Sequence, residues 1–332
     1  MAISFGRKNR PSPIIGKPSG PGTAGRTPSA APSAQGSGRQ SFIDPLVLQK
    51  LSSLQLVAKV VVQGFVTGLH RSPYHGFSVD FAEYREYSEG DDLRNIDWNV
   101  FARTDRYYVK KYEGETNTAL HFLLDMSGSM RYRSGKISKL DYARFLTASL
   151  GYFAFRQKDA IGLYLFDDAI RQFLPPRLRR THMNRFLTIL ENAGQGGATD
   201  WRQPLERIAQ LVTRRGIVII VSDFYSDLTE LFRGVRMLQS RGHDAILFQV
   251  LDPYELEFPF DNLTLLEDTE TREKVLVVPQ VSRKAYLESF KQHQELLREQ
   301  AAASGADCML LRTDRPLDEA LLNYLTVRHR RG

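Results

Sequence analysis

The hydrophobic residues beyond Thr116 alternate between short apolar runs and longer segments with helical spacing. Buried strands are predicted where the runs are apolar almost throughout, at 119–124, 160–166, 217–221, 245–251 and 308–311. Between them, apolar residues recur at intervals of three and four, as in the helix predicted over 138–157. Strands that are apolar on both faces and alternate with helices predict a mostly parallel sheet covered on both sides, a doubly wound α/β fold.

The same patterns predict the remaining elements. An edge strand is expected over 170–174, a hairpin with strands 263–266 and 274–278, and helices over 182–192, 203–214, 228–241, 282–304 and 317–327. Ahead of this domain, Asp44 and Pro45 form the N-cap and first turn of a helix predicted to run to about residue 66. Glycine, proline and aromatic residues then predict short strands at 76–81 and 107–112.

These patterns divide the chain into three parts. Residues 1–42 form a Gly-, Pro- and Ser-rich tail that cannot bury enough apolar surface to fold. Residues 43–115 form a small module of a helix and strands, and 116–330 form the α/β domain, with a hairpin-like insertion at about 253–280. The tail carries six of the 45 Lys and Arg residues and none of the 38 acidic ones. The rest of the chain is therefore almost neutral, so the net charge of +7 does not indicate a specific nucleic-acid partner.

Composition excludes several other classes. The one cysteine, Cys308, lies in a predicted strand, which excludes a disulfide framework and a cysteine-rich zinc site and predicts a buried thiol. No run reaches the ~18 apolar residues that a membrane-spanning helix needs, and the N-terminus lacks the apolar core of a secretory signal. We therefore expect a cytoplasmic protein with no membrane insertion.

Oxygen ligands for a divalent cation follow the predicted strands. In an open α/β sheet, ligands bind beyond the carboxyl ends of the strands. Asp125, Ser127 and Ser129 follow the first strand, Asp223 follows the strand 217–221, and Thr199 lies in a Gly-rich loop. These hard donors suit Mg²⁺ or Mn²⁺ rather than Zn²⁺. Taken alone, however, Asp-x-Ser-x-Ser is also a common helix cap.

A second group of charged residues precedes the α/β domain. Its charged members are Arg85, Asp91, Asp92, Arg94, Asp97 and Arg103, and Gly90 and Trp98 lie among them. Three carboxylates within seven residues could hold a second cation, act in acid–base chemistry or contact a partner. Because Arg pairs well with carboxylates and Trp anchors buried surfaces, we favour a structural network that holds the N-terminal module on the sheet domain.

Two stretches carry a family resemblance. Residues 122–130 (FLLDMSGSM), with Thr199 and Asp223, resemble the metal-ion-dependent adhesion site of von Willebrand factor A domains. Residues 84–98 (YREYSEGDDLRNIDW) are similar to the signature of the bacterial family catalogued as domain of unknown function 58. The likeness spans about 68–328 and implies a von Willebrand factor A-like fold.

The resemblance also implies a role for each ligand. Ser127, Ser129 and Thr199 would bind Mg²⁺ directly or nearly so, and Asp125 and Asp223 directly or through water. A Glu or Asp from a partner protein would take the open position. The family resemblance further implies a MoxR-type AAA+ ATPase as partner, in an assembly or chaperone-like role.

The leading hypothesis is therefore a non-enzymatic interaction module. The alternative is a metal-dependent hydrolase of phosphatase or nuclease type, with Asp200 or Asp223 as general base. A third possibility is a scaffold whose site is empty. The chain contains no G-x-x-x-x-G-K-[ST] motif, and Ser127 lacks the G-x-S-x-G context, so we expect neither P-loop ATP hydrolysis nor serine-nucleophile chemistry.

Overall fold

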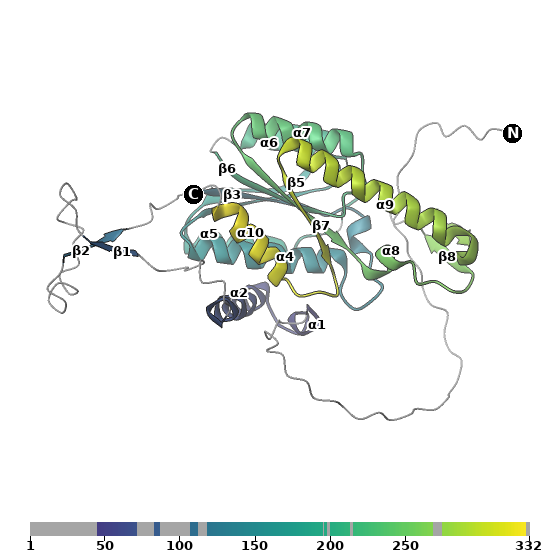
Figure 1. Ribbon diagram of the computed structural model, residues 1–332, viewed down its shortest axis with the longest axis horizontal. Coiled ribbons are helices and arrows are strands. Elements are labelled where there is room, and N and C mark those ends of the chain that lie inside the picture. Colours follow the sequence, from purple (N-terminus) through teal and green to yellow (C-terminus); the bar gives the residue numbers. More distant parts are fainter. Residues whose placement is uncertain are drawn as a thin grey trace, which may run out of the picture.

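A six-stranded sheet forms the centre of the molecule. The computed structural model describes residues 45–71, 83–86, 107–111, 118–194, 196–197, 200–212, 215–267 and 274–329. The strands of the central sheet are β3 (Ala119–Asp125), β4 (Ala160–Phe166), β5 (Ile170–Arg177), β6 (Gly216–Ser222), β7 (Asp244–Leu251) and β10 (Asp307–Arg312). They run across the sheet in the order β10-β7-β6-β3-β4-β5 (Figure 1). Neighbours are parallel except β4 and β5, which confirms the predicted mostly parallel sheet with an antiparallel edge strand.

The chain changes direction across the sheet between β3 and β6. After β3 it continues to β4 on one side, and later returns to β6 on the other side of β3. Leu124 of β3 lies opposite Val221 of β6, so the two strands end at the same edge. The carboxyl ends of β3 and β6 therefore flank the topological switch point, where ligands of doubly wound sheets bind.

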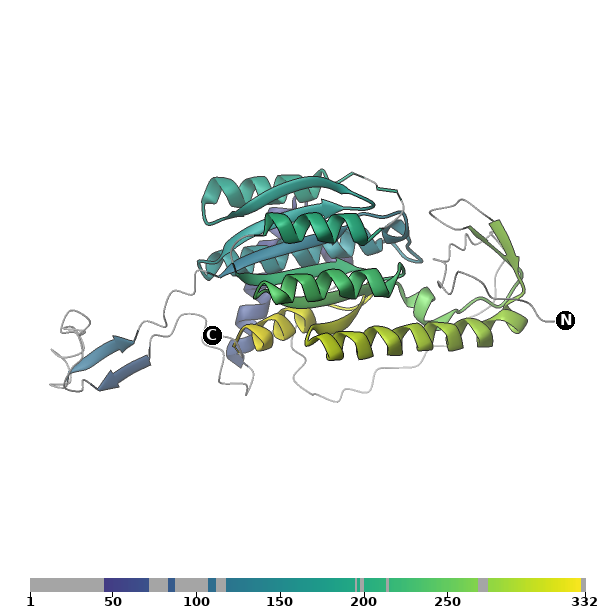
Figure 2. The same ribbon diagram turned by 90° about the horizontal axis from the view of Figure 1, so that it is seen from above.

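Helices cover both faces of the sheet (Figures 1 and 2). One layer contains α2 (Leu54–Arg71), α4 (Lys139–Arg156), α5 (Arg180–Glu191) and α10 (Asp318–His329). The other contains α6 (Arg202–Leu211), α7 (Leu228–Ser240) and α9 (Pro279–Ser304). Successive strand residues alternate between these cores, with Phe122 and Leu124 in the first and Leu123 in the second. Burial on both faces explains why the strands are apolar throughout.

Helix α4 begins and ends where its sequence predicts. Ser138 caps it, because its hydroxyl accepts the N–H of Asp141 at 3.0 Å while the Asp141 carboxylate bonds back to Ser138. The predicted apolar face is buried along its whole length, at Leu140, Ala143, Thr147, Leu150 and Ala154. Local capping and helical spacing thus define this element together.

The predicted N-terminal helix is interrupted. It forms α1 (Pro45–Leu48) and, after a break at 49–53, the longer α2. Glu191 of α5 accepts the N–H of Leu54 at 2.6 Å, at the start of α2. The apolar side of α2 is buried in the core that contains α4, and the Phe65 ring meets Phe153 edge-on at 6.0 Å. The helix ahead of the signature is therefore part of the core of the α/β domain.

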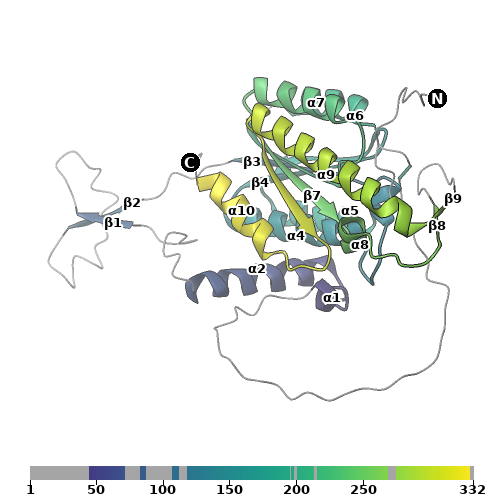
Figure 3. The ribbon, with the colours of Figure 1, turned by 45° about the vertical axis from the view of Figure 1, so that its right-hand side comes forward.

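Smaller elements flank the sheet. β1 (Glu83–Glu86) and β2 (Tyr108–Lys111) pair antiparallel, as do β8 (Thr264–Glu267) and β9 (Lys274–Val277) in the predicted insertion. The insertion lies at the end of the sheet where β7 ends (Figure 3). It opens with a short helix, α8 (Pro253–Glu257). The predicted tail 1–42 and strand 76–81 lie outside the described residues.

Two expectations from composition can be compared with the structure. Cys308 of β10 is partly buried against the second core, and burial raises the pKa of its thiol to about 11. Among the described helices, none combines the length and apolar character that crossing a membrane requires.

Removing the Phe65 ring tests whether α2 is part of the core. We expect Phe65→Ala to lower the free energy of unfolding by about 3 kcal/mol or more, because it leaves a cavity beside Phe153. Leu56→Ala, on the exposed side of the same helix, is the matched control and should change stability by less than ~0.5 kcal/mol. Urea unfolding curves give both values. Equal, small effects would show that α2 does not support the domain.

Candidate metal centre

The loop after β3 gathers three of the predicted ligands. Asp125 Oδ1 accepts the N–H of Ser127 at 2.8 Å, and the hydroxyl oxygens of Ser127 and Ser129 lie 3.0 Å apart. Ser129 begins a short 3-10 turn, η2 (Ser129–Arg131). All three side chains are at most 2% exposed. The structure therefore brings these residues together at the end of β3, and what they bind stays a prediction.

Asp223 joins this loop from the end of β6. The Ser222 hydroxyl donates to Asp125 Oδ2 at 2.6 Å, which links the ends of the two strands. The same hydroxyl oxygen accepts the N–H of Phe224 at 3.0 Å. Phe224 has a left-handed backbone with φ of 57°, a strained conformation for a bulky residue. The backbone thus turns sharply just after Asp223, whose side chain is buried.

The Gly-rich loop is held against the β3 loop by backbone contacts. The N–H of Gly196 donates to the carbonyl of Met126 at 2.9 Å, and the N–H of Gly128 donates to that of Gly197 at 2.8 Å. A Cβ on Gly196 would lie 2.6 Å from the Met126 carbonyl oxygen, so the close approach requires glycine. Thr199 itself lies outside the described residues, but its loop is anchored beside the candidate site.

A buried lysine that the sequence analysis did not identify lies at the same edge. Lys139 is the first residue of α4, and its side chain is fully buried. Its Nζ donates to Asp223 Oδ2 at 2.8 Å and to Glu255 Oε1 at 2.6 Å. The rings of Tyr225 and Tyr132 lie 4.8 and 5.9 Å from the ammonium. These carboxylates and ring faces replace the water that a buried cation loses.

Glu255 lies in α8, the short helix that follows β7. Asp252 caps α8, with Pro253 at its first position and Glu255 bonding back to the Asp252 N–H at 2.9 Å. Asp-Pro-x-Glu is a capping-box pattern, so the sequence does contain a signal for this helix. Asp252 also accepts the N–H of Ser134 at 2.9 Å, which ties α8 to the loop between β3 and α4.

The charges at this edge are not balanced. Burial, followed by the neighbouring Asp223 carboxylate, raises the pKa of Asp125 to about 7. Burial also raises the pKa of Glu255 to about 7, although Lys139 opposes the shift. For Lys139, burial lowers the pKa, but the two carboxylates outweigh it and the net pKa is raised. Two carboxylates, Asp223 and Glu255, contact the one ammonium, and Asp125 interacts with Asp223, so a divalent cation would relieve repulsion between carboxylates at this edge.

The donor set fits a small, hard divalent ion. The 3.0 Å between the two serine hydroxyl oxygens equals the spacing of about 3 Å between adjacent corners of an octahedral Mg²⁺ site. Ser127, Ser129 and Asp125 would hold the ion, with Asp223 binding directly or through water. Within the described segments, no three or more His, Cys, Asp or Glu side chains form a group that could hold a metal. Such a site therefore depends on hydroxyl ligands.

The charged signature ahead of the domain is described at one position. Arg85 lies in β1, opposite Val109 of β2. The remaining signature residues, Gly90, Asp91, Asp92, Arg94, Asp97, Trp98 and Arg103, lie outside the described residues. The network between Arg and Asp side chains remains a prediction.

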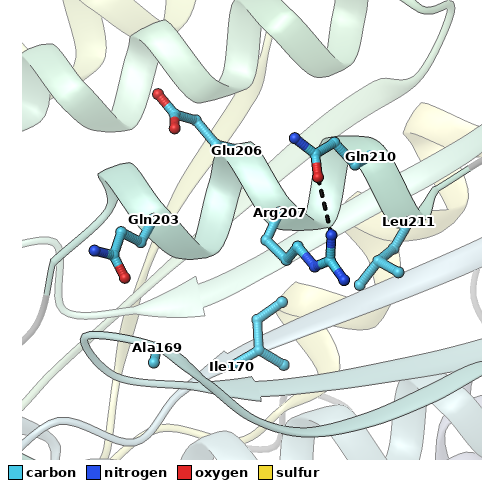
Figure 4. A pocket seen from close by; sticks show the side chains of 7 residues that line it. All are labelled: Ala169, Ile170, Gln203, Glu206, Arg207, Gln210 and Leu211. Carbon is cyan, nitrogen blue, oxygen red and sulfur yellow. Dashed lines mark hydrogen bonds between the residues drawn. The ribbon is translucent and has the colours of Figure 1, made fainter.

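Two surface hollows lie near the carboxyl edge. One adjoins the candidate site, and its lining includes Met126, Asp167, Arg171, Gly196 and Gly197. The other, between the turn after β4 and helix α6, is shown in Figure 4; it is lined by Ala169, Ile170, Gln203, Glu206, Arg207, Gln210 and Leu211. Only the first of these two hollows shares a residue with the loop that carries the predicted ligands.

Adding a methyl group at Gly196 tests the contact between the two loops. We expect Gly196→Ala to lower the free energy of unfolding by about 1–3 kcal/mol, because the methyl group would collide with the Met126 carbonyl. Gly194→Ala is the matched control, since a Cβ there would meet nothing within 4 Å. Chemical denaturation measures both. A Gly196 variant as stable as the Gly194 variant would mean that the loops are not closely packed.

Comparison with known proteins identifies the family. The family model described as "Protein of unknown function DUF58" matches residues 83–296. Uncharacterized protein Rv1480 of Mycobacterium tuberculosis is 25% identical over 296 residues, which cover 88% of this chain and 93% of the relative. Uncharacterized protein MAV169 of Mycobacterium avium is 24% identical over 147 residues, 44% of this chain and 86% of the relative.

Solved structures with a similar fold have low sequence identity. The conserved hypothetical protein BatB from Bacteroides thetaiotaomicron is 12% identical, with a TM-score of 0.43, over 64% of this chain and 99% of that one. The VWA domain of SpRpn10 is 12% identical, with a TM-score of 0.39, over 62% and 94% of the two chains. Since the family model matches more than half of the sequence, the chain belongs to the DUF58 family.

Proposed function

We propose that this protein is a non-enzymatic interaction module that presents a divalent cation, Mg²⁺ or Mn²⁺, to a Glu or Asp of a partner protein. The observation that carries the proposal is the convergence of Asp125, Ser127, Ser129 and Asp223 at the switch point of the sheet. An ion held there by neutral hydroxyls and two carboxylates would keep a position for one further oxygen ligand. A partner carboxylate would replace water in that position.

The chain's own residues are arranged to orient the ligands in advance. Asp125 Oδ1 accepts the Ser127 N–H and Oδ2 accepts the Ser222 hydroxyl, so its orientation is fixed before an ion arrives. Pre-organised ligands reduce the entropic cost of binding. A partner residue would approach from the hollow lined by Met126, Gly196 and Gly197, since Met126 belongs to the ligand loop.

We further propose a MoxR-type AAA+ ATPase as the partner, in an assembly or chaperone-like role. The support for this step is membership of the family and the resemblance of the ligand loop to an adhesion site. In such a pair, the ATPase would supply nucleotide hydrolysis, and this chain would supply the cation-dependent docking surface.

The contacts of the two potential general bases favour an interaction module over a hydrolase. Asp223 Oδ2 is bonded to the ammonium of Lys139, and its Oδ1 accepts the N–H of Tyr225 at 3.3 Å. Asp200 is exposed, and its carboxylate accepts the N–H of Arg202 at 2.9 Å. A base in hydrolysis must be available to take a proton from water beside the ion.

Substitution of the ligand loop tests the proposal. We expect Asp125→Ala and Ser127→Ala to weaken both Mg²⁺ binding and binding to a purified MoxR-type ATPase at least about tenfold, because each removes an oxygen ligand. Calorimetry measures the first, and an immobilised-partner assay with Mg²⁺ or with chelator measures the second. The control is Ser226→Ala, which also removes a serine hydroxyl at this edge but outside the ligand cluster. It should leave both Mg²⁺ binding and partner binding unchanged.

Two results would contradict the proposed function. One is partner binding that is equally strong in excess chelator. The other is full partner binding by both variants while their unfolding curves remain like that of the wild type.

A further inference from the structure

Lys139 connects the proposed cation site with the insertion that follows β7. Its ammonium is shared between Asp223, 2.8 Å away on the cation side, and Glu255 of α8, 2.6 Å away. The side chains of Lys139 and Glu255 are both fully buried. The contact therefore lies where bulk water does not screen it.

The ammonium and a divalent cation would act on the same carboxylate. Asp223 Oδ2 already accepts a hydrogen bond from the Lys139 ammonium, so a bound ion would meet a partly neutralised ligand and a positive charge close by. Glu255 reduces this effect, because it takes a second N–H of the same ammonium. The carboxylates of Asp125, Asp223 and Glu255 outnumber the one ammonium, so a divalent ion would offset negative charge at this edge.

We propose that Lys139 is the internal counter-ion that sets the affinity of the cation site, and that Glu255 raises this affinity by sharing the ammonium. The proposal rests on the proposed function and identifies which residues determine the ion affinity of the same site. Lys139 and Glu255 are positioning residues, since neither is a ligand of the ion. Because Glu255 belongs to α8, the docking of α8 contributes to ion affinity.

The neutralisation of Glu255 should leave α8 in place. Asp252 caps this helix and bonds the Ser134 N–H at 2.9 Å, and the Tyr286 hydroxyl donates to the Glu255 carbonyl at 2.8 Å. Gln at position 255 can still accept a hydrogen bond from Lys139. The charge can therefore be changed while the contacts of the backbone are kept.

The experiment measures Mg²⁺ and Mn²⁺ dissociation constants by calorimetry on the full chain. Glu255→Gln should bind at least about tenfold more weakly. The Lys139 ammonium is then no longer paired with a second carboxylate, and its full charge acts on Asp223. The double variant Lys139→Met/Glu255→Gln has the net charge of the wild type but no ammonium at Asp223. It should bind at least about threefold more tightly than the wild type. It leaves one buried carboxylate, Asp223, without the ammonium, whereas Lys139→Met alone would leave two.

Matched surface variants control for charge. Glu257→Gln changes an exposed carboxylate of α8. Lys136→Met/Glu257→Gln repeats the double change with an exposed lysine from the loop that precedes α4. Both should bind within about twofold of the wild type, since surface charges are screened. Far-UV circular dichroism and urea unfolding confirm that each variant is folded.

The outcomes separate this inference from the proposed function. If Glu255→Gln and the double variant both bind the ion with the dissociation constant of the wild type, the role of Lys139 is overturned. The proposed function would then still stand. An ion bound by the double variant and not by the wild type would support the role of Lys139 and overturn the proposed function. Folded proteins that bind no ion in any form would overturn both.

Discussion

The contact of one buried ammonium with two carboxylates joins three parts of the chain that are far apart in sequence. Lys139 starts α4, Asp223 follows β6, and Glu255 lies in α8 after β7. A lysine is fully buried only when opposite charges replace its water, and removal of one partner leaves an uncompensated buried charge. The loops that follow β3, β6 and β7 are therefore held around a common point, and the geometry of the candidate metal centre depends on it.

The topology of the sheet determines where this point lies. β3 and β6 are parallel neighbours whose connections leave in opposite directions, so the loops after them separate and leave access to the sheet edge. Asp125 and Asp223 are adjacent because the two strands end together, and the Ser222 hydroxyl of β6 bonds Asp125 of β3 at that edge. The excess of carboxylates over ammonium makes the edge favourable for a cation. In the proposed site, the neutral hydroxyls of Ser127 and Ser129 would leave such a cation able to accept a further carboxylate.

Much of the fold is predictable from local patterns, because the strands are apolar on both faces and α4 carries its own cap at Ser138. Asp125, Ser127 and Ser129 are found by their spacing, and Asp223 by its place after a strand. The break before Leu54 was missed, since the apolar spacing continues across it. Helix α8 was also missed, although its capping-box pattern is present in the sequence.

Lys139 and Glu255 could not be predicted by such patterns. Lys139 follows a helix cap, where a lysine is ordinarily exposed, and it meets Glu255 across 116 positions of sequence. The contact depends on how α4, β6 and α8 pack, and local spacing contains no information on that packing. The contact between these two residues can be identified only from their burial and their distance in the folded structure.

Anomalous diffraction from crystals grown with Mn²⁺ would show whether this edge of the sheet holds a divalent cation, as we propose. We expect one strong anomalous peak about 2.0–2.2 Å from the hydroxyl oxygens of Ser127 and Ser129, on the side of Asp125. Lys139 should remain bonded to Glu255 in that structure. If the edge instead carried no peak at saturating Mn²⁺, and the two hydroxyls were still bonded to each other, the claim would be contradicted.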